Sequence, residues 1–260
     1  MKDLLLALDI GNTTIEFGVF RKDALLCSWR LSSTVSRTPD ESWLAVAGLL
    51  RDANLDPKQL AALALASVVP EHTGSFTAMA QARFDTNPLV ISTETCPFIE
   101  VRYHDPRQVG ADRLCNAYAG AHYYGAPVVV VDFGTAITLD VVDQNGAYLG
   151  GVIAPGPGTS AAQLHRRTAQ LPKVSLDFPD RIIGDSTEHA IRAGITWGIV
   201  DMVDGLIDRI CAELGSNPKV VATGGWSPAY SQRSRRFTKH DPNLTLQGVR
   251  LLHERVRGAA

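Results

Sequence analysis

The stretch that decides the fold is LLLALDIGNT, residues 4–13. A short apolar run leads directly into the acidic Asp9, and Gly11 then lets the backbone turn tightly. Apolar residues occupy every second position from Ile15 to Val19, which is the period of a β-strand. The pattern predicts a buried strand, a glycine turn and a second strand, with a carboxylate where the first strand ends.

The same design returns as VVVVDFGTA, residues 128–136. Asp132 ends an apolar strand as Asp9 does, and Gly134 follows two positions later as Gly11 does. Another strand, a turn and a third strand are expected after it. Two units of one design predict a duplicated α/β fold, with mixed sheets flanked by helices in each half and a cleft between the halves.

A boundary between the halves is predicted near residues 115–125, inside or just after a helix from Val109 to Tyr124 that Gly125 would cap. We therefore expect a first half over residues 1–117 and a second half over residues 118–260.

Two further helices have clear signals. Thr38 as N-cap and Glu41 three residues later form a capping box, which predicts a helix near 40–53. The longest helix is expected over residues 186–214, with Gly194 and Gly198 as a notch for close packing, within the monomer or across a dimer. Its predicted apolar stripe consists of Ile191, Ile195, Ile199, Met202 and Leu206.

Composition excludes several classes of protein. The 260 residues carry a formal net charge of −2, so no strong field favours nucleic acid or membrane as a partner. A basic run at Arg233, Arg235 and Arg236 is interpreted as a solvated face. The four cysteines show no metal-ligand or disulfide spacing, and the apolar run at 4–8 is too short for a signal peptide. We expect a cytoplasmic protein.

The turn at Asp9–Thr13 has the groups that phosphate binding requires. An acidic residue there needs a cation or a donor, and a glycine turn presents backbone N–H groups to an anion. Such a turn is more often an ordinary hairpin. The copy at Asp132 and a third glycine turn, TGG at Thr223–Gly225, favour a nucleotide site. The P-loop motif is absent, and no GxGxxG follows a strand.

The tetrapeptide GADR, Gly110–Arg113, places a carboxylate and a guanidinium at a helix start, where anions are favoured. Asp112 is the candidate base for a substrate hydroxyl, and Arg113 is suited to a substrate carboxylate. A plain helix start is the alternative. The segment GGVIAPG, 150–156, is expected to be a rigid loop or a pocket wall, and Thr187 either caps its helix or donates to a ligand.

In order along the chain stand DIGNT, SVVP (67–70), GADR, DFGTA, GGVIAPG, TAQLP (168–172), GDST (184–187) and TGG. With these motifs the chain resembles the type III pantothenate kinases, a family of the acetate kinase/hsp70/actin-like superfamily. The resemblance implies two ribonuclease H-like, actin-like ATPase domains. It also implies a homodimer that uses ATP to phosphorylate pantothenate to 4′-phosphopantothenate, the first step of coenzyme A biosynthesis.

The resemblance also implies roles for single residues. The ATP-binding residues would be Asp9, Ile10, Gly11, Asn12, Thr13, Thr14, Ile15, Glu16, Thr135, Gly224 and Gly225. The pantothenate-binding residues would be Tyr103, Gly110, Ala111, Asp112, Arg113 and Thr187, with Asp112 as the catalytic proton acceptor. Asp9 would lie close to Mg²⁺, and Asp132 would hold a monovalent cation, potassium or ammonium.

Two alternatives stay open at this point. One is a kinase of the same superfamily that acts on a sugar or an acyl acid, although Arg113 and Tyr103 suit a small carboxylate better than a hexose. The other is a non-catalytic transcriptional accessory factor on this fold. The three carboxylates of Asp9, Asp112 and Asp132 argue against it, because a pure binding module needs none of them for catalysis.

Overall fold

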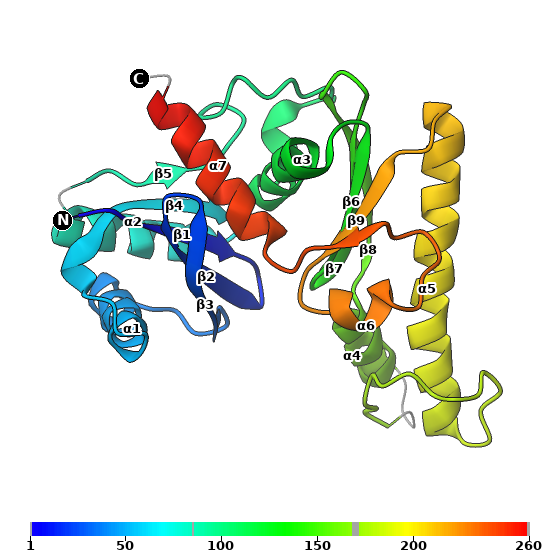
Figure 1. The fold of residues 1–260 in the computed structure, drawn as a ribbon. Coiled ribbons are helices and arrows are strands. Elements are labelled where there is room, and N and C mark those ends of the chain that lie inside the picture. The colour runs from blue at the N-terminus through cyan, green and yellow to red at the C-terminus, as the bar shows by residue number, and fades with distance from the viewer. Residues whose placement is uncertain (1, 85, 168–171, 259–260) are drawn as a thin grey trace. The chain divides into compact units, whose positions relative to one another are not determined.

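The computed structural model describes residues 2–84, 86–167 and 172–258. It divides into two compact units, Met1–Ala119 with Leu244–Ala260 (unit 1) and Gly120–Asn243 (unit 2). Figure 1 shows the elements of both units along the chain. Residues 168–171 of the TAQLP motif lie outside the described residues.

Unit 1 is built on a mixed five-stranded sheet in the order β3-β2-β1-β4-β5. β1 and β2 pair antiparallel, as do β2 and β3, whereas β4 runs parallel to β1 on its other side. The strands are β1 (Leu4–Ile10), β2 (Thr14–Arg21), β3 (Ala24–Ser32), β4 (Leu60–Ser67) and β5 (Leu89–Val90). The helices are α1 (Pro39–Asp52), α2 (Pro70–Phe84) and α7 (Leu244–Gly258), with short 3₁₀ turns η1 (Pro57–Gln59) and η2 (Pro106–Gln108). The helix α3 (Ala111–Tyr124) begins in unit 1, and its residues 120–124 belong to unit 2.

Unit 2 repeats this topology, with strand order β8-β7-β6-β9-β10. β6, β7 and β8 pair antiparallel and β9 runs parallel to β6, so β6 takes the place of β1. The strands are β6 (Val128–Phe133), β7 (Ala136–Val142), β8 (Tyr148–Pro155), β9 (Lys219–Thr223) and β10 (Lys239–His240). The helices are α4 (Pro157–Arg167), α5 (Thr187–Leu214) and α6 (Ser227–Ser231). The duplication predicted from the two aspartate turns is confirmed.

β1 is apolar along its length because helices cover both faces of the sheet. Leu4, Leu6 and Leu8 belong to a core with side chains of α1 and α2. Leu5 and Ala7 point the other way, into a core with side chains of α3 and α7. β6 follows the same rule, since its alternate residues Val129, Val131 and Phe133 pack in a core with residues of α5.

The capping box of α1 forms as predicted. The Glu41 N–H donates to Thr38 Oγ1 at 3.3 Å, and the Thr38 N–H donates to Glu41 Oε2 at 2.8 Å. Four helices escaped prediction, namely α2, α4, the short α6 and α7. Pro70 is the first residue of α2, where its missing N–H costs nothing. Most of GGVIAPG is not a loop, because β8 extends to Pro155.

The stripe predicted for α5 was partly right, because Ile199 belongs to the core of unit 2 and Ile195, Met202 and Leu206 pack against that core. Of its five residues only Ile199 is buried, and the other four are half-buried. The buried face consists of Ala193, Thr196, Ile199, Val200, Val203, Asp204, Ile207 and Ile210. Gly194 and Gly198 are exposed, and a Cβ built on either meets no atom of the described chain within 4 Å. The notch therefore does not serve packing within the part of unit 2 that the structure describes.

We expected residues 118–260 to form the second half, but the C-terminal helix belongs to the first. α7 packs on β1, β2 and β4, which places it in unit 1. A buried hydrogen bond, in which Thr245 Oγ1 donates to Asn116 Oδ1 at 2.8 Å, ties α7 to α3. Within the described ranges, none of the helices has the length and apolar character needed to span a bilayer.

Gly248 allows α7 to touch α3, because a Cβ built there would lie 2.7 Å from the Cys115 carbonyl carbon and 2.8 Å from its Cα. We expect Gly248→Ala to lower the free energy of unfolding by about 1–3 kcal/mol, because backbone cannot move aside cheaply. Thermal unfolding would measure this change. Gly258→Ala, in the same helix and in open space, is the control. Equal melting temperatures for the two variants would contradict the close packing.

Candidate functional site

The turn between β1 and β2 presents mostly backbone to its surroundings. The Gly11 N–H donates to the Thr14 carbonyl at 3.0 Å, which closes the turn. Asn12 and Thr13 are exposed, whereas the Ile10 and Ile15 side chains are fully buried. The two isoleucines could therefore meet a nucleotide only through their backbone.

Two neighbouring segments hold this turn in place. The Ser33 N–H donates to the Thr13 carbonyl at 3.0 Å, and the Val68 N–H donates to the Ile10 carbonyl at 3.1 Å. Val68 belongs to the SVVP motif, so this motif supports the turn from the end of β4. Glu16, predicted among the ATP-binding residues, is engaged at 2.5 Å by Arg30 Nε on the neighbouring strand β3.

The start of α3 carries a partly desolvated carboxylate. Burial raises the pKa of Asp112, while the Arg113 N–H bond and the Arg113 charge act in the opposite direction. That N–H donates to Asp112 Oδ1 at 2.9 Å, and Arg113 is itself buried. A Cβ on Gly110 would overlap the same Oδ1 atom, so only glycine leaves the carboxylate its place. A raised pKa suits a group that must accept a proton.

The carboxylates of Asp9 and Asp112 both influence the pKa of one buried thiol, that of Cys115. Burial first, and then the negative charges of Asp9 and Asp112, raise the pKa of Cys115 well above its ordinary value. Both carboxylates are therefore near Cys115 in unit 1, although 103 positions separate them in the chain (112 − 9 = 103). Sequence reasoning missed Cys115, whose place three positions after Asp112 on a helix was its only signal.

In unit 2 the DFGT turn, the segment around Gly156 and the TGG turn come together at the end of β6. The Gly156 N–H and Thr159 Oγ1 both donate to the Thr135 carbonyl, at 3.0 and 2.6 Å. Gly224 has φ +90°, and a Cβ on it would overlap the Asp132 carboxylate. The DFGT turn, the start of α4 and the TGG turn thus pack backbone against backbone. The structure brings Gly224 against Asp132, and Thr135 against Gly156 and Thr159. The nucleotide site expected at these turns stays a prediction.

Two predicted substrate residues lie on more open segments. Tyr103 is half-buried in the loop before η2, and Thr187 is exposed as the first residue of α5. Thr187 is not the helix cap, because the Ser186 side chain accepts the His189 N–H at 3.2 Å. Its hydroxyl is thus not used for capping.

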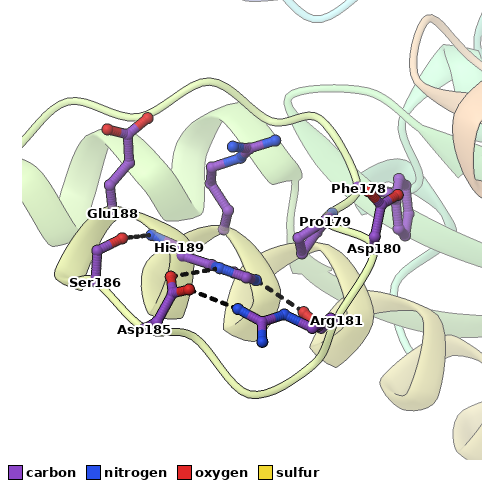
Figure 2. Close-up of a pocket in the computed structure, with 9 residues that line it drawn as sticks. Phe178, Pro179, Asp180, Arg181, Asp185, Ser186, Glu188 and His189 are labelled. Carbon is purple, nitrogen blue, oxygen red and sulfur yellow. Dashed lines mark hydrogen bonds and ion pairs between the residues drawn. The ribbon is translucent and has the colours of Figure 1, made fainter.

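A polar pocket of about 430 Å³ adjoins the start of α5. Figure 2 shows its His189 ring between Asp185 and the Arg181 carbonyl. His189 Nδ1 lies 3.2 Å from Asp185 Oδ1, and Nε2 lies 2.8 Å from the carbonyl oxygen. Arg181 Nη2 donates to Asp185 at 2.5 Å. These contacts hold the GDST turn against the helix that carries Thr187.

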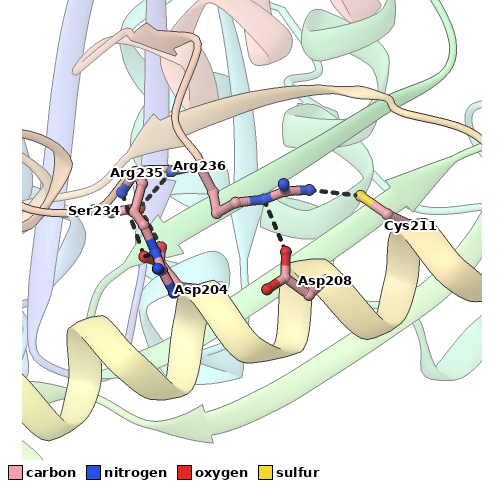
Figure 3. Close-up of polar contacts among 6 residues, drawn as sticks. All are labelled: Asp204, Asp208, Cys211, Ser234, Arg235 and Arg236. Carbon is pink, nitrogen blue, oxygen red and sulfur yellow. Dashed lines mark hydrogen bonds and ion pairs between the residues drawn. The ribbon is translucent and has the colours of Figure 1, made fainter.

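The basic run after TGG is tied to α5 (Figure 3). Asp204, which is buried, accepts from Ser234 Oγ and from Arg235 Nε. Arg236 Nε pairs with Asp208 at 3.2 Å, and its Nη2 donates to Cys211 Sγ at 3.0 Å. The run was interpreted as a solvated face, but these bonds anchor the segment to unit 2.

The donor set suits magnesium bound together with a nucleotide. Among the described residues, no three His, Cys, Asp or Glu side chains gather as a metal cage would require. Mg²⁺ in kinases is typically held by one or two carboxylates and by the substrate phosphates, and Asp9 beside the β1–β2 turn fits that arrangement.

Known structures share this fold. A Campylobacter jejuni protein assigned to the Baf family of transcriptional activators aligns with TM-score 0.60 and 20% identity, over 97% of this chain and 99% of that one. The ROK hexokinase from Thermus thermophilus aligns with TM-score 0.51 and 15% identity, over 98% and 99%. These neighbours confirm the predicted duplicated actin-like ATPase fold.

Sequence relatives are much closer. The family model for type III pantothenate kinase matches residues 5–209. Curated proteins named type III pantothenate kinase are similar over nearly the whole chain. The one from Rhodospirillum centenum is 43% identical, covering 97% of this chain and 98% of its own. The one from Anaeromyxobacter sp. strain K is 42% identical, covering 98% and 100%. This chain belongs to the type III pantothenate kinase family.

Proposed function

We propose that this chain transfers the γ-phosphoryl group of ATP to the primary hydroxyl of pantothenate, giving ADP and 4′-phosphopantothenate, the first step of coenzyme A biosynthesis. Membership of the family supports this reaction. The observation that carries it is the partly buried Asp112 at the start of α3, whose Oδ1 accepts the Arg113 N–H at 2.9 Å.

In this mechanism the hydroxyl oxygen forms a bond to the γ-phosphorus while the bond to the β–γ bridging oxygen breaks. Asp112 accepts the hydroxyl proton, and Arg113 pairs with the pantothenate carboxylate. Backbone N–H groups of the β1–β2 turn bind phosphate oxygens, and Asp9 holds Mg²⁺. The metal ion, when bound, neutralises the phosphate charge, so most of the catalysis is positioning and charge stabilisation.

The remaining site residues belong to the same proposal. Thr135, Gly224 and Gly225 bind ATP, while Tyr103 and Thr187 contact pantothenate. Asp132 holds a monovalent cation, K⁺ or NH₄⁺. Its support is the position of Asp132, which pairs with Thr223 of β9 and whose carboxylate lies against Gly224, so that it stands beside the TGG turn.

The enzyme works as a homodimer in this proposal. The α5 notch supports it, because Gly194 and Gly198 are exposed and a Cβ built on either meets no described atom within 4 Å. Small residues in open space let a second helix approach closely. A cytoplasmic location is part of the proposal and agrees with four cysteines that are all free.

The deciding assay follows ADP release from MgATP with pantothenate, acetate or a hexose as acceptor, each with and without K⁺. Turnover with pantothenate alone, stimulated by K⁺, is expected. An Asp132→Asn variant should lose the K⁺ stimulation. Turnover with a hexose or acetate instead would point to another kinase of the superfamily. ATP binding without any turnover would favour a regulatory protein.

Asp112→Asn tests the proton acceptor. We expect kcat to fall about 10²–10⁴-fold while the Kd for MgATP stays unchanged. The pKa of Asp112 is raised by folding, so the ionised carboxylate costs stability at pH 7, and the variant should melt at or above the wild-type temperature. Asp56→Asn, at the exposed start of η1, is the control. An unchanged kcat would remove Asp112 from the mechanism.

The pH dependence of kcat gives a separate test. Because Asp112 acts deprotonated and its pKa is raised, activity should fall on acidification at a pH above the ordinary 3.8. Arg113 lowers that pKa, so Arg113→Leu should move the acid limb to higher pH. Arg107→Leu, which removes an exposed guanidinium nearby in the chain, should leave the limb in place. If the acid limb of the kcat profile stays in place in Arg113→Leu, Asp112 is not the group that titrates.

A further inference from the structure

A line of hydrogen bonds connects the exposed β1–β2 turn with a buried histidine. The Ser33 N–H donates to the Thr13 carbonyl at 3.0 Å, and the Ser33 carbonyl lies 2.8 Å from His72 Nε2. His72 stands in the first turn of α2 and is 2% exposed. One residue, Ser33, thus links the nucleotide turn to the ring.

The same helix turn supports the other side of the nucleotide turn. Val68, whose N–H donates to the Ile10 carbonyl, is flanked by Ser67 and Val69. Thr73 Oγ1 donates to the carbonyl of Val69 and to Ser67 Oγ, at 3.0 and 2.7 Å. His72 and Thr73, which are adjacent in α2, therefore fix the two segments that contact the turn, Ser33 on one side and residues 67–69 on the other.

The chemistry at His72 argues against a purely structural role. A carbonyl oxygen only accepts, so Nε2 carries the proton and Nδ1 is left as an acceptor. Among the described residues, His72 Nδ1 finds no hydrogen-bond partner, and neither does the buried hydroxyl of Ser33. Burying such atoms without partners costs stability, and an apolar side chain would fill the space without that cost. The bond to the Ser33 carbonyl is what a histidine adds here.

We propose that His72 is a positioning residue for nucleotide binding, which sets the place of the Thr13 peptide through Ser33. This inference rests on the proposed role of the β1–β2 turn. Backbone donors discriminate a phosphate only when they are held within a fraction of an ångström, so a turn with two exposed residues needs support from the buried core. His72 itself touches no substrate.

The test compares His72→Leu with His72→Gln, whose amide can still donate. Calorimetry without pantothenate should show a Kd for MgADP about tenfold higher in His72→Leu, with most of the affinity restored in His72→Gln. The KM for MgATP should rise in parallel, and the KM for pantothenate should stay within about twofold. His253→Leu removes another buried histidine of unit 1 and should leave the Kd for MgADP unchanged, whatever its melting temperature.

Folded His72→Leu with wild-type affinity for MgADP would overturn the inference, as would an equal rise in both KM values. If His72→Leu does not fold, amide hydrogen exchange of the wild-type protein, measured with and without MgADP, tests the inference instead. MgADP should slow exchange at residues 10–14, at Ser33 and at 68–73 together, and protection confined to 10–14 would overturn the inference. Wild-type protein that binds no MgADP would remove the proposed function itself, and this inference with it.

Discussion

An aspartate near the end of an otherwise buried strand is the constraint on which both units depend. β1 and β6 are apolar except at their last position but one, where a half-buried Asp9 or Asp132 must be matched by hydrogen-bond donors or cations. The glycine two positions later turns the chain, so that the next strand pairs antiparallel while backbone N–H groups remain at the turn. Asp9 and Asp132 thus stand at equivalent points of two sheets with one strand order. Sheet and site follow from the same local design.

In the proposed mechanism, the desolvated carboxylate of Asp112 exchanges stability for chemistry. Burial raises its pKa, and Arg113 limits that rise. A fully solvated aspartate would be a weaker base, and one without Arg113 would be protonated over a wider pH range. Gly110 leaves the carboxylate its space, because a Cβ there would overlap it. In the proposed mechanism the tetrapeptide GADR therefore combines a helix start, a base and a cation.

Local signals predicted the strands around both aspartates, the capping box of α1 and the extent of α5 well. They failed where a residue type is compatible with two structures. A proline such as Pro70 can end a strand or begin a helix, and the packing of α2 on β4 shows that it begins a helix. The buried face of α5 includes Thr196 and Asp204, so apolar residues alone indicated only a part of that face. Thr196 is satisfied by the Arg192 carbonyl at 2.8 Å, which a hydropathy pattern does not reveal.

By itself the sequence determined the duplicated α/β design, the three glycine turns and the family, because these depend on residues adjacent in the chain. The tertiary structure decided what depends on residues far apart. It placed α7 with unit 1, because Gly248 allows helix contact with Cys115. It also put Asp9 and Asp112 beside one thiol, and linked Thr13 to His72 through Ser33. Long-range packing and hydrogen bonds between separate segments have no periodic signature, so no local pattern could have predicted them.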